Sequence, residues 1–205
     1  MEFPRNQESL AELGKWLVRE FCDLNDLTTP EMDVIPLDHW SVGACAYYRH
    51  NTIRLCLPCC GRPCTEAQSR NWSWPGSVTD REPYGVFAHE LGHHVDMLSG
   101  TQRGAYWSDY SSWMLKTSGE KPLTSYAATN PAEWFAEAFR LFATNPELLS
   151  LVRPRTHALI TQKWKPAYSG WGWLHALGSN VPARVVKAQR NKMVVQPGAI
   201  HKSLF

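Results

Sequence analysis

The sequence predicts an α+β fold in which a few short strands precede a series of longer helices. Apolar residues recur at helical spacing over residues 7–24, so this segment is expected to form an amphipathic helix. The dipeptide Val34-Ile35 and the stretches 44–48 and 52–57 are rich in β-prone residues, and His50-Asn51 between the last two favours a hairpin. Beyond residue 79 the pattern is mainly helical, which places the expected core strands early in the chain.

A second helix is expected to begin at the capping-box pattern of residues 79–82 and to end at Gly100. One face of this helix is apolar and is formed by Tyr84, Phe87, Leu91, Val95 and Leu98. The opposite face carries His89, His93 and Asp96. The segment is therefore predicted to pack its apolar face against the core and to turn its histidine face toward a cleft.

Three more helical segments follow. Residues 106–115 are expected to form one helix. Asn130-Pro131 supplies an N-cap and a first-turn proline for the next helix, whose polar side carries Glu133 and Glu137. The core stripe of that helix consists of Phe135, Ala138, Phe139 and Phe142. Asn145-Pro146 is predicted to close it and to open a shorter helix.

Length and composition fit one folded domain with a small appendage. The chain has 205 residues, of which 43% are hydrophobic and 20% charged, and its formal net charge is +2. Residues 1–165 are expected to form the domain. Residues 166–205 form a Trp/Gly-rich extension, and two β-prone stretches in it favour a C-terminal hairpin. The nearly neutral charge argues against nucleic acid or an anionic membrane as the main partner.

The first residues of the chain bear on the compartment in which the protein is expected. It lacks the apolar core of a secretory signal, and no run of residues approaches the length needed to span a membrane. We therefore expect a cytoplasmic protein without a membrane partner. Delivery into another cell by a dedicated machinery leaves no mark in such a sequence, and the pattern predicts no oligomeric state.

Four of the six cysteines are bunched, at Cys56, Cys59, Cys60 and Cys64. Three states of this cluster remain open: a second, structural zinc site, reduced or buried thiols, and disulfides. A structural zinc normally uses two separated Cys-x-x-Cys knuckles, and only one is present. Cys45 or His50 are the residues that would complete such a site.

The segment His89-Glu90-Leu91-Gly92-His93 indicates a metal site. On a helix, residues four apart differ in direction by only about 40°, so His89 and His93 present two imidazoles to one point. This is the arrangement that a tetrahedral zinc ion requires. Glu90 lies about 100° from His89, where a carboxylate can act on a metal-bound water as a general base. The pattern predicts a zinc-dependent peptidase.

A third ligand is needed, and three acids are candidates. Asp96 lies on the histidine face of the same helix, but three ligands from one straight helix fit a tetrahedron poorly, so Asp96 is expected to orient a histidine or to cap a neighbouring group. Glu133 and Glu137 lie one turn apart on a later helix. Glu133 also fits the third position of a capping box after Asn130. Spacing alone does not choose between them.

Two separated motifs resemble one family. Residues 123–141, with the sequence LTSYAATNPAEWFAEAFRL, and residues 89–96, with the sequence HELGHHVD, are similar to the catalytic domain of anthrax lethal factor, a gluzincin-type zinc endopeptidase. The resemblance covers roughly residues 79–143. It implies a zincin-like metallopeptidase domain, in which a small twisted sheet packs on the HExxH helix beside a helical C-terminal subdomain.

Carried over by position, the resemblance assigns roles to individual residues. Glu133 becomes the third zinc ligand, and Tyr126 becomes the phenol that donates a hydrogen bond to the developing oxyanion. Glu137 matches a supporting acid near the metal, and Asp96 also has a counterpart. The implied activity is endopeptidase hydrolysis of a protein or peptide by a metal-activated water, with Glu90 as general base.

Two alternatives to this function remain open. One is a catalytically silent binding module that keeps the zincin fold. The other is a peptidase recruited to nucleic acid through the cysteine cluster and the basic tail with Lys187, Arg190 and Lys192, although a solvated hairpin face explains that tail better. An extended substrate would add to a sheet edge, for which residues 52–55 are a candidate, and an interior strand is the equal alternative.

Overall fold

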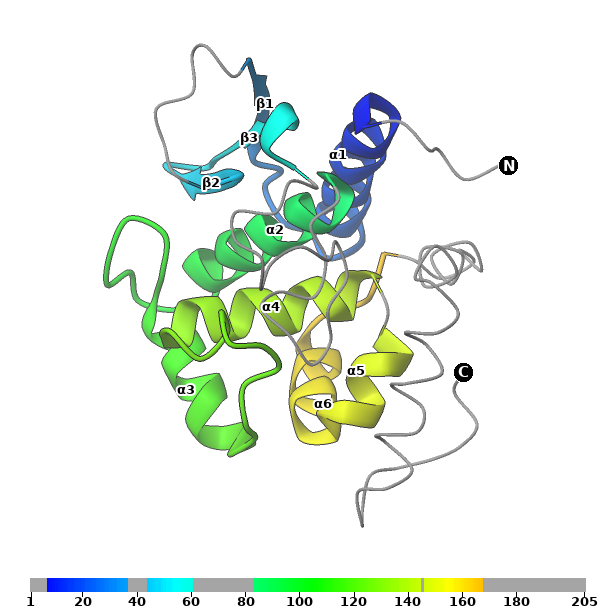
Figure 1. Ribbon diagram of the computed structural model, residues 1–205. Helices are drawn as coiled ribbons and strands as arrows, with labels where there is room; N and C mark the ends of the chain where they lie inside the picture. Colours follow the sequence, from blue (N-terminus) through cyan, green and yellow to red (C-terminus); the bar gives the residue numbers. More distant parts are fainter. Residues whose placement is uncertain (1–6, 37–43, 61–82, 145, 168–205) are drawn as a thin grey trace.

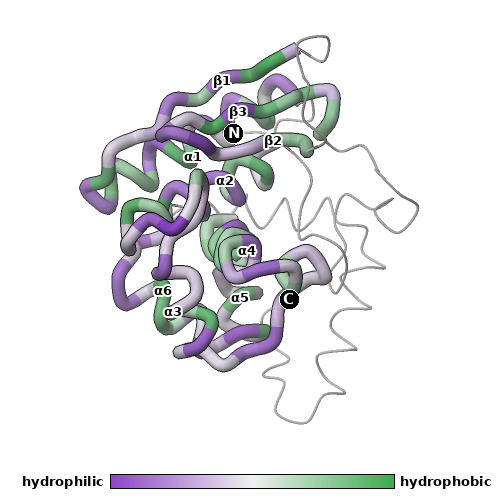
Figure 2. Tube along the Cα trace, turned by 90° about the vertical axis from the view of Figure 1, so that its left-hand side faces the viewer, coloured by the Kyte–Doolittle hydropathy of each residue, from purple (hydrophilic) through white to green (hydrophobic). Residues whose placement is uncertain are grey.

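The computed structural model describes residues 7–36, 44–60, 83–144 and 146–167. Within these ranges it confirms the α+β class. A three-stranded sheet lies beside α1 (Gln7–Leu24) and above α2 (Pro83–Ser99), and α4 (Pro131–Thr144) lies below α2 (Figure 1). The remaining helices lie below α4, and the view turned by 90° shows the same order (Figure 2). The sheet and the lower helices thus enclose the α2–α4 pair.

The sheet has the strand order β1-β3-β2, with β1 at Glu31–Ile35, β2 at Ala46–Arg49 and β3 at Thr52–Cys56. Strand β1 pairs with β3 in parallel, and β2 pairs with β3 antiparallel. The predicted hairpin is confirmed: His50 and Asn51 have φ values of 49° and 59°, the left-handed conformation that a two-residue hairpin turn requires. Because β3 is the central strand, the expectation that residues 52–55 form a substrate-binding edge is wrong and the interior alternative holds.

The first helix has the predicted bounds and buries one face. Its apolar residues, among them Leu17 and Phe21, pack in the core with α2. The ring of Phe21 meets that of Phe139 on α4 at 5.1 Å in an edge-to-face contact. This packing joins the first segment of the chain to the helix that carries Glu133.

Helix α2 is buried on every side from Pro83 to Asp96. Helix α4 packs against α2, and Glu133 reaches its histidine face, while the predicted cleft beside that face stays a prediction. Gly92 allows the two helices to approach closely, since a Cβ atom there would lie 2.8 Å from the Cα atom of Ala136. Leu98 was assigned to the apolar stripe, but its side chain is 49% exposed near the end of the helix.

Helix α4 begins as predicted. The side chain of Asn130 accepts a hydrogen bond from the backbone amide of Glu133 at 3.0 Å, which confirms Asn130 as N-cap. The expected core stripe of α4 is buried, and Glu133 and Glu137 are buried as well. Their side of the helix therefore packs against α2 and does not face solvent.

The later helices differ in part from the prediction. Helix α3 spans Asp109–Ser118, three residues later than expected at each end, because Ser108 caps it and accepts a hydrogen bond from the amide of Tyr110. Helix α5 (Pro146–Val152) follows as predicted, whereas α6 (Pro154–Lys163) had no counterpart in the prediction. No helix among the described residues has the length and apolar character to cross a bilayer.

The described residues of the cysteine cluster show two of the three states left open. Cys56 and Cys59, at the two ends of the short helix η2 (Leu57–Cys59), are joined by a disulfide, while Cys60 is a buried thiol. Cys64 lies outside the described residues, as do the capping box at 79–82, the C-terminal hairpin and the basic tail. The boundary between residues 165 and 166 stays a prediction.

Candidate metal centre

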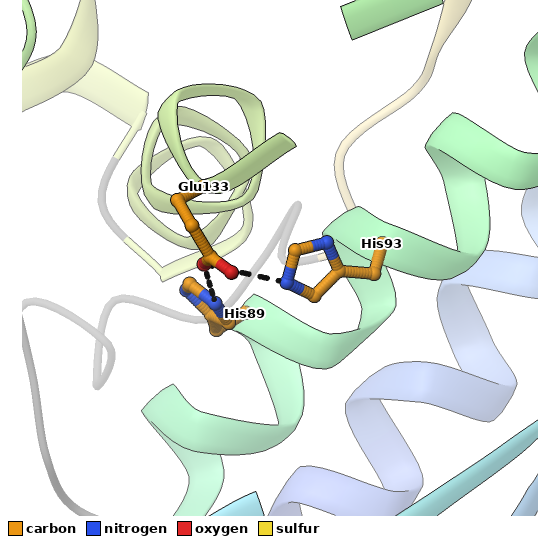
Figure 3. Close-up of side chains that lie close together, drawn as sticks. All are labelled: His89, His93 and Glu133. Carbon is orange, nitrogen blue, oxygen red and sulfur yellow. Dashed lines mark hydrogen bonds and ion pairs between the residues drawn. The ribbon is translucent and has the colours of Figure 1, made fainter. Parts of the chain in front are cut away.

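Three buried side chains from two helices converge on one point. His89 and His93 come from α2, and Glu133 comes from the first turn of α4 (Figure 3). One ligand atom from each residue lies within 4.8 Å of the other two. The relative exposures are 3%, 4% and 7%, so all three side chains are buried. The group could hold a metal ion.

The histidines turn the same ring atom toward the carboxylate. The Nε2 atom of His89 lies 3.0 Å from an Oε2 atom of Glu133, and the Nε2 atom of His93 lies 3.4 Å from the same oxygen (Figure 3). Of the three acids weighed as third ligand, Glu133 is the one in this group. Its carboxylate reaches the histidines and does not close a capping box.

The other ring nitrogen of His89 has a separate partner. Its Nδ1 atom lies 2.9 Å from Oε1 of Glu137, so an Nδ1–H donates to that carboxylate, and a neutral His89 directs its Nε2 lone pair toward Glu133. A lone pair and a carboxylate oxygen repel each other unless a cation lies between them. The donor set therefore fits a divalent ion bound by two imidazoles and one carboxylate.

The two carboxylates beside His89 also affect its protonation. Burial and the nearby Arg140 lower the pKa of His89, but hydrogen bonds to Glu133 and Glu137 outweigh them and raise the pKa to about 9. Without a metal ion, His89 would therefore be an imidazolium, with one N–H donating to Glu137 and the other to Glu133. A metal ion would replace the proton on Nε2.

Glu137 connects the site to its surroundings. Its side chain is fully buried, and it accepts hydrogen bonds from His89, from Nη2 of Arg140 at 3.0 Å and from the hydroxyl of Thr124 at 3.2 Å. The paired charge of Arg140 offsets the cost of burying the carboxylate. Glu137 therefore orients the ring of His89 through Nδ1 and is not part of the group of three. Its supporting role near a metal stays a prediction.

Asp96 serves the start of α3. Its carboxylate accepts hydrogen bonds from the amides of Ser108 and Ser111, both at 2.8 Å, and from the hydroxyl of Ser108 at 2.9 Å. Burial raises the pKa of Asp96, and these hydrogen bonds oppose the rise. Asp96 thus caps a neighbouring helix, one of the two roles expected for it, and anchors the segment that follows α2.

Glu90 and Tyr126 lie at the same site. Glu90 is buried, and desolvation raises the pKa of its carboxyl while the charges of His89 and His93 oppose the rise. The Tyr126 ring stacks on His89 with centroids 5.7 Å apart, and its hydroxyl donates a hydrogen bond to Glu133. Burial and the carboxylates of Glu133 and Glu90 raise the pKa of this phenol, which keeps it a donor.

Comparison with known proteins adds nothing to this geometry. No protein-family model, characterised protein or solved structure matches the chain.

Sequence reasoning missed two residues that shape the site. Gly92 sets the close approach of α2 and α4, and its place between the histidines is the signal that could have revealed this. His94 is buried next to His93 but points elsewhere: its Nε2–H donates to the carbonyl of Thr28 at 2.8 Å, and its Nδ1 accepts from the hydroxyl of Tyr48 at 3.1 Å. His94 ties the metal helix to the sheet.

Proposed function

We propose that this protein is a zinc-dependent endopeptidase with a zincin-like domain of the gluzincin type. The observation that carries the proposal is the convergence of His89, His93 and Glu133 beside a buried acid that is not a ligand, Glu90. Two imidazoles and one carboxylate are the donor set of catalytic zinc sites in several peptidases. The resemblance of residues 89–96 and 123–141 to the lethal factor family points to the same activity.

The residues have distinct roles in the proposed reaction. A zinc ion, when bound, supplies a Lewis acid that polarises a water molecule and a carbonyl group. His89, His93 and Glu133 would hold it. Glu90 takes the proton of the attacking water and delivers it to the leaving amine, a transfer favoured by the raised pKa of its carboxyl. Tyr126 donates its phenolic hydrogen to the oxygen of the scissile carbonyl as negative charge develops there.

A silent zincin-fold binding module is the weaker alternative. A purely structural metal site closes with a fourth protein ligand and requires neither a general base nor a phenol. Here Glu90 is kept buried, which carries a desolvation cost that a structural role would not recover. The association with nucleic acid is not proposed, because Cys56 and Cys59 form a disulfide and no observation favours that partner. A second zinc ion at the cysteine cluster is not proposed either, because the disulfide occupies two of the sulfur atoms that would bind it.

The substrate path that the structure favours differs from the predicted one. Strand β2 pairs with β3 along one side, and within the described residues no strand covers its other side. The bond between Tyr48 of β2 and His94 of α2 holds this strand beside the metal helix. An extended peptide would add to the outer edge of β2 by backbone hydrogen bonds.

A pocket of about 430 Å³ lies where β2 and α2 end. Its walls include Tyr48, Met97, Leu98, Gln102 and Ala105. Met97 is one helical turn beyond His93, and the walls carry no formal charge when His50 is neutral. We infer that the pocket takes an uncharged side chain of the peptide.

The test of the proposed activity is the variant Glu90→Gln. It should bind one equivalent of zinc as tightly as the unchanged protein yet fail to cleave a random peptide library analysed by mass spectrometry. Glu12→Gln, an exposed change on α1, is the matched control and should cleave normally. Equal cleavage by Glu90→Gln and the unchanged protein would exclude Glu90 as base, and no cleavage by the unchanged protein with bound zinc would favour the binding module.

A further inference from the structure

The segment before α4 carries Tyr126 and is tied down at Thr124. The side chain of Thr124 is buried, and its hydroxyl donates to Oε2 of Glu137 at 3.2 Å. The same hydroxyl accepts a hydrogen bond from the backbone amide of Ala127 at 3.0 Å. One hydroxyl thus joins the backbone just after Tyr126 to a buried carboxylate.

The backbone of Tyr126 is also held from the other direction. Its carbonyl accepts the amide of Thr129 at 3.0 Å and the hydroxyl of Thr129 at 2.7 Å. The turn therefore fixes the main chain on both sides of Tyr126, although the tyrosine side chain itself is 38% exposed. The turn therefore contributes to the position of the phenol, together with the stacking of its ring on His89.

The carboxylate that Thr124 binds is the one that orients His89. Oε1 of Glu137 takes the bonds of His89 and Arg140, and Oε2 takes that of Thr124. Glu137 is fully buried and paired with a charge, so its position is well determined. His89 and the turn that carries Tyr126 are therefore both held by the same carboxylate, that of Glu137.

We propose that Thr124 is a positioning residue, which sets the phenol of Tyr126 relative to the metal site by tying its turn to Glu137. This role uses both functions of the Thr124 hydroxyl, which donates to Glu137 and accepts from the amide of Ala127. The stacking of Tyr126 on His89, with an interplanar angle of 29°, is the geometry that Thr124 maintains. The catalytic consequence rests on the proposed function, but the positioning itself does not.

Thr124→Val and Thr124→Ser form a matched pair of variants. Valine has the shape of threonine but lacks the hydroxyl, which leaves the amide of Ala127 and one oxygen of Glu137 without their present partner. Serine keeps the hydroxyl and loses only a methyl group. Thermal unfolding of both variants establishes that they are folded before either is compared.

The first measurement is the NMR signal of the Tyr126 ring, which does not depend on peptidase activity. In protein labelled with carbon-13 on its tyrosine rings, the Tyr126 signal is assigned by its loss in Tyr126→Phe. The stacked imidazole shifts this signal by its ring current, so Thr124→Val should move it toward the value of a free tyrosine, while Thr124→Ser should leave it in place. An unchanged Tyr126 signal in folded Thr124→Val overturns the proposal.

The second measurement separates positioning from a general structural role. Thr124→Val should lower kcat roughly 10-fold or more with little change in KM and in zinc affinity, because a buried hydrogen bond is lost and the phenol is misplaced. In a Tyr126→Phe background the same change should have no further effect. Equal losses in both backgrounds overturn the proposal. If the unchanged protein cleaves nothing, the proposed activity fails, and the tyrosine signal still decides the role of Thr124.

Discussion

His89 and Glu133 lie 44 positions apart in the sequence, yet a ring nitrogen of one is 3.0 Å from a carboxylate oxygen of the other. The contact joins α2 to α4 in the buried centre of the protein. It requires a close crossing of the two helices and a rotation of α4 that turns its acidic side inward. The candidate metal site therefore depends on helix packing as much as on the HExxH pattern.

The two acids of α4 should differ in their effect on metal binding. Glu133→Ala removes an expected ligand and should lower zinc affinity by several orders of magnitude. Glu137→Ala removes only the partner of His89 and should lower it by about 10- to 100-fold. Competition with a chelator measures both. A larger loss in Glu137→Ala would show that the ligand assignment is wrong.

Gly92→Ala should destabilise the protein although alanine favours helices. The added Cβ atom would lie 2.8 Å from Cα of Ala136 and 3.0 Å from Cβ of Phe139, and the first of these is backbone that cannot move aside alone. We expect a net loss of about 1–3 kcal/mol in the free energy of unfolding, against a propensity gain of about 1 kcal/mol. Denaturant unfolding measures the loss, and zinc affinity should fall with it. A more stable variant would contradict the close packing.

Zinc uptake should depend on pH through His89. The raised pKa of about 9 means that metal-free His89 is protonated below that pH, so zinc must displace a proton. Apparent zinc affinity should rise with pH up to about 9, by as much as about 10-fold per unit for one proton, and level off above it. Chelator competition between pH 6 and pH 9 tests this.

Glu137→Gln is the control for the pH effect. It removes one of the carboxylates that raise the pKa of His89, so the levelling-off should begin at a lower pH. A zinc affinity independent of pH in the unchanged protein would contradict the raised pKa of His89 beside Glu133 and Glu137.

Ala105→Trp should change which peptides are cleaved. A large ring at this exposed position narrows the pocket beside Met97 and Leu98. The preference for peptides with a bulky apolar residue over those with alanine should fall by roughly 10-fold or more, measured as a ratio of kcat/KM values, with zinc affinity unchanged. Leu24→Trp, an exposed change on α1, is the control and should keep the preference.

Several elements could be predicted because their signals are local. The periodicity of α1, the His50-Asn51 turn and the N-cap Asn130 depend on residues close in sequence, and all three are confirmed. The histidine pair likewise follows from the helical repeat alone. Helix α3 was placed three residues too early because its start depends on Ser108 and on the distant Asp96.

The sequence by itself determined the secondary structure of the central elements, the histidine pair and the set of candidate acids. Only the tertiary structure decided that β3 is interior, that Leu98 is exposed and that Glu133, not Glu137 or Asp96, meets both histidines. The physical reason is that spacing along a helix determines direction around its own axis. Which neighbour lies in that direction depends on the crossing of α2 and α4, and that crossing depends on the close contact at Gly92 and the packing of the whole core.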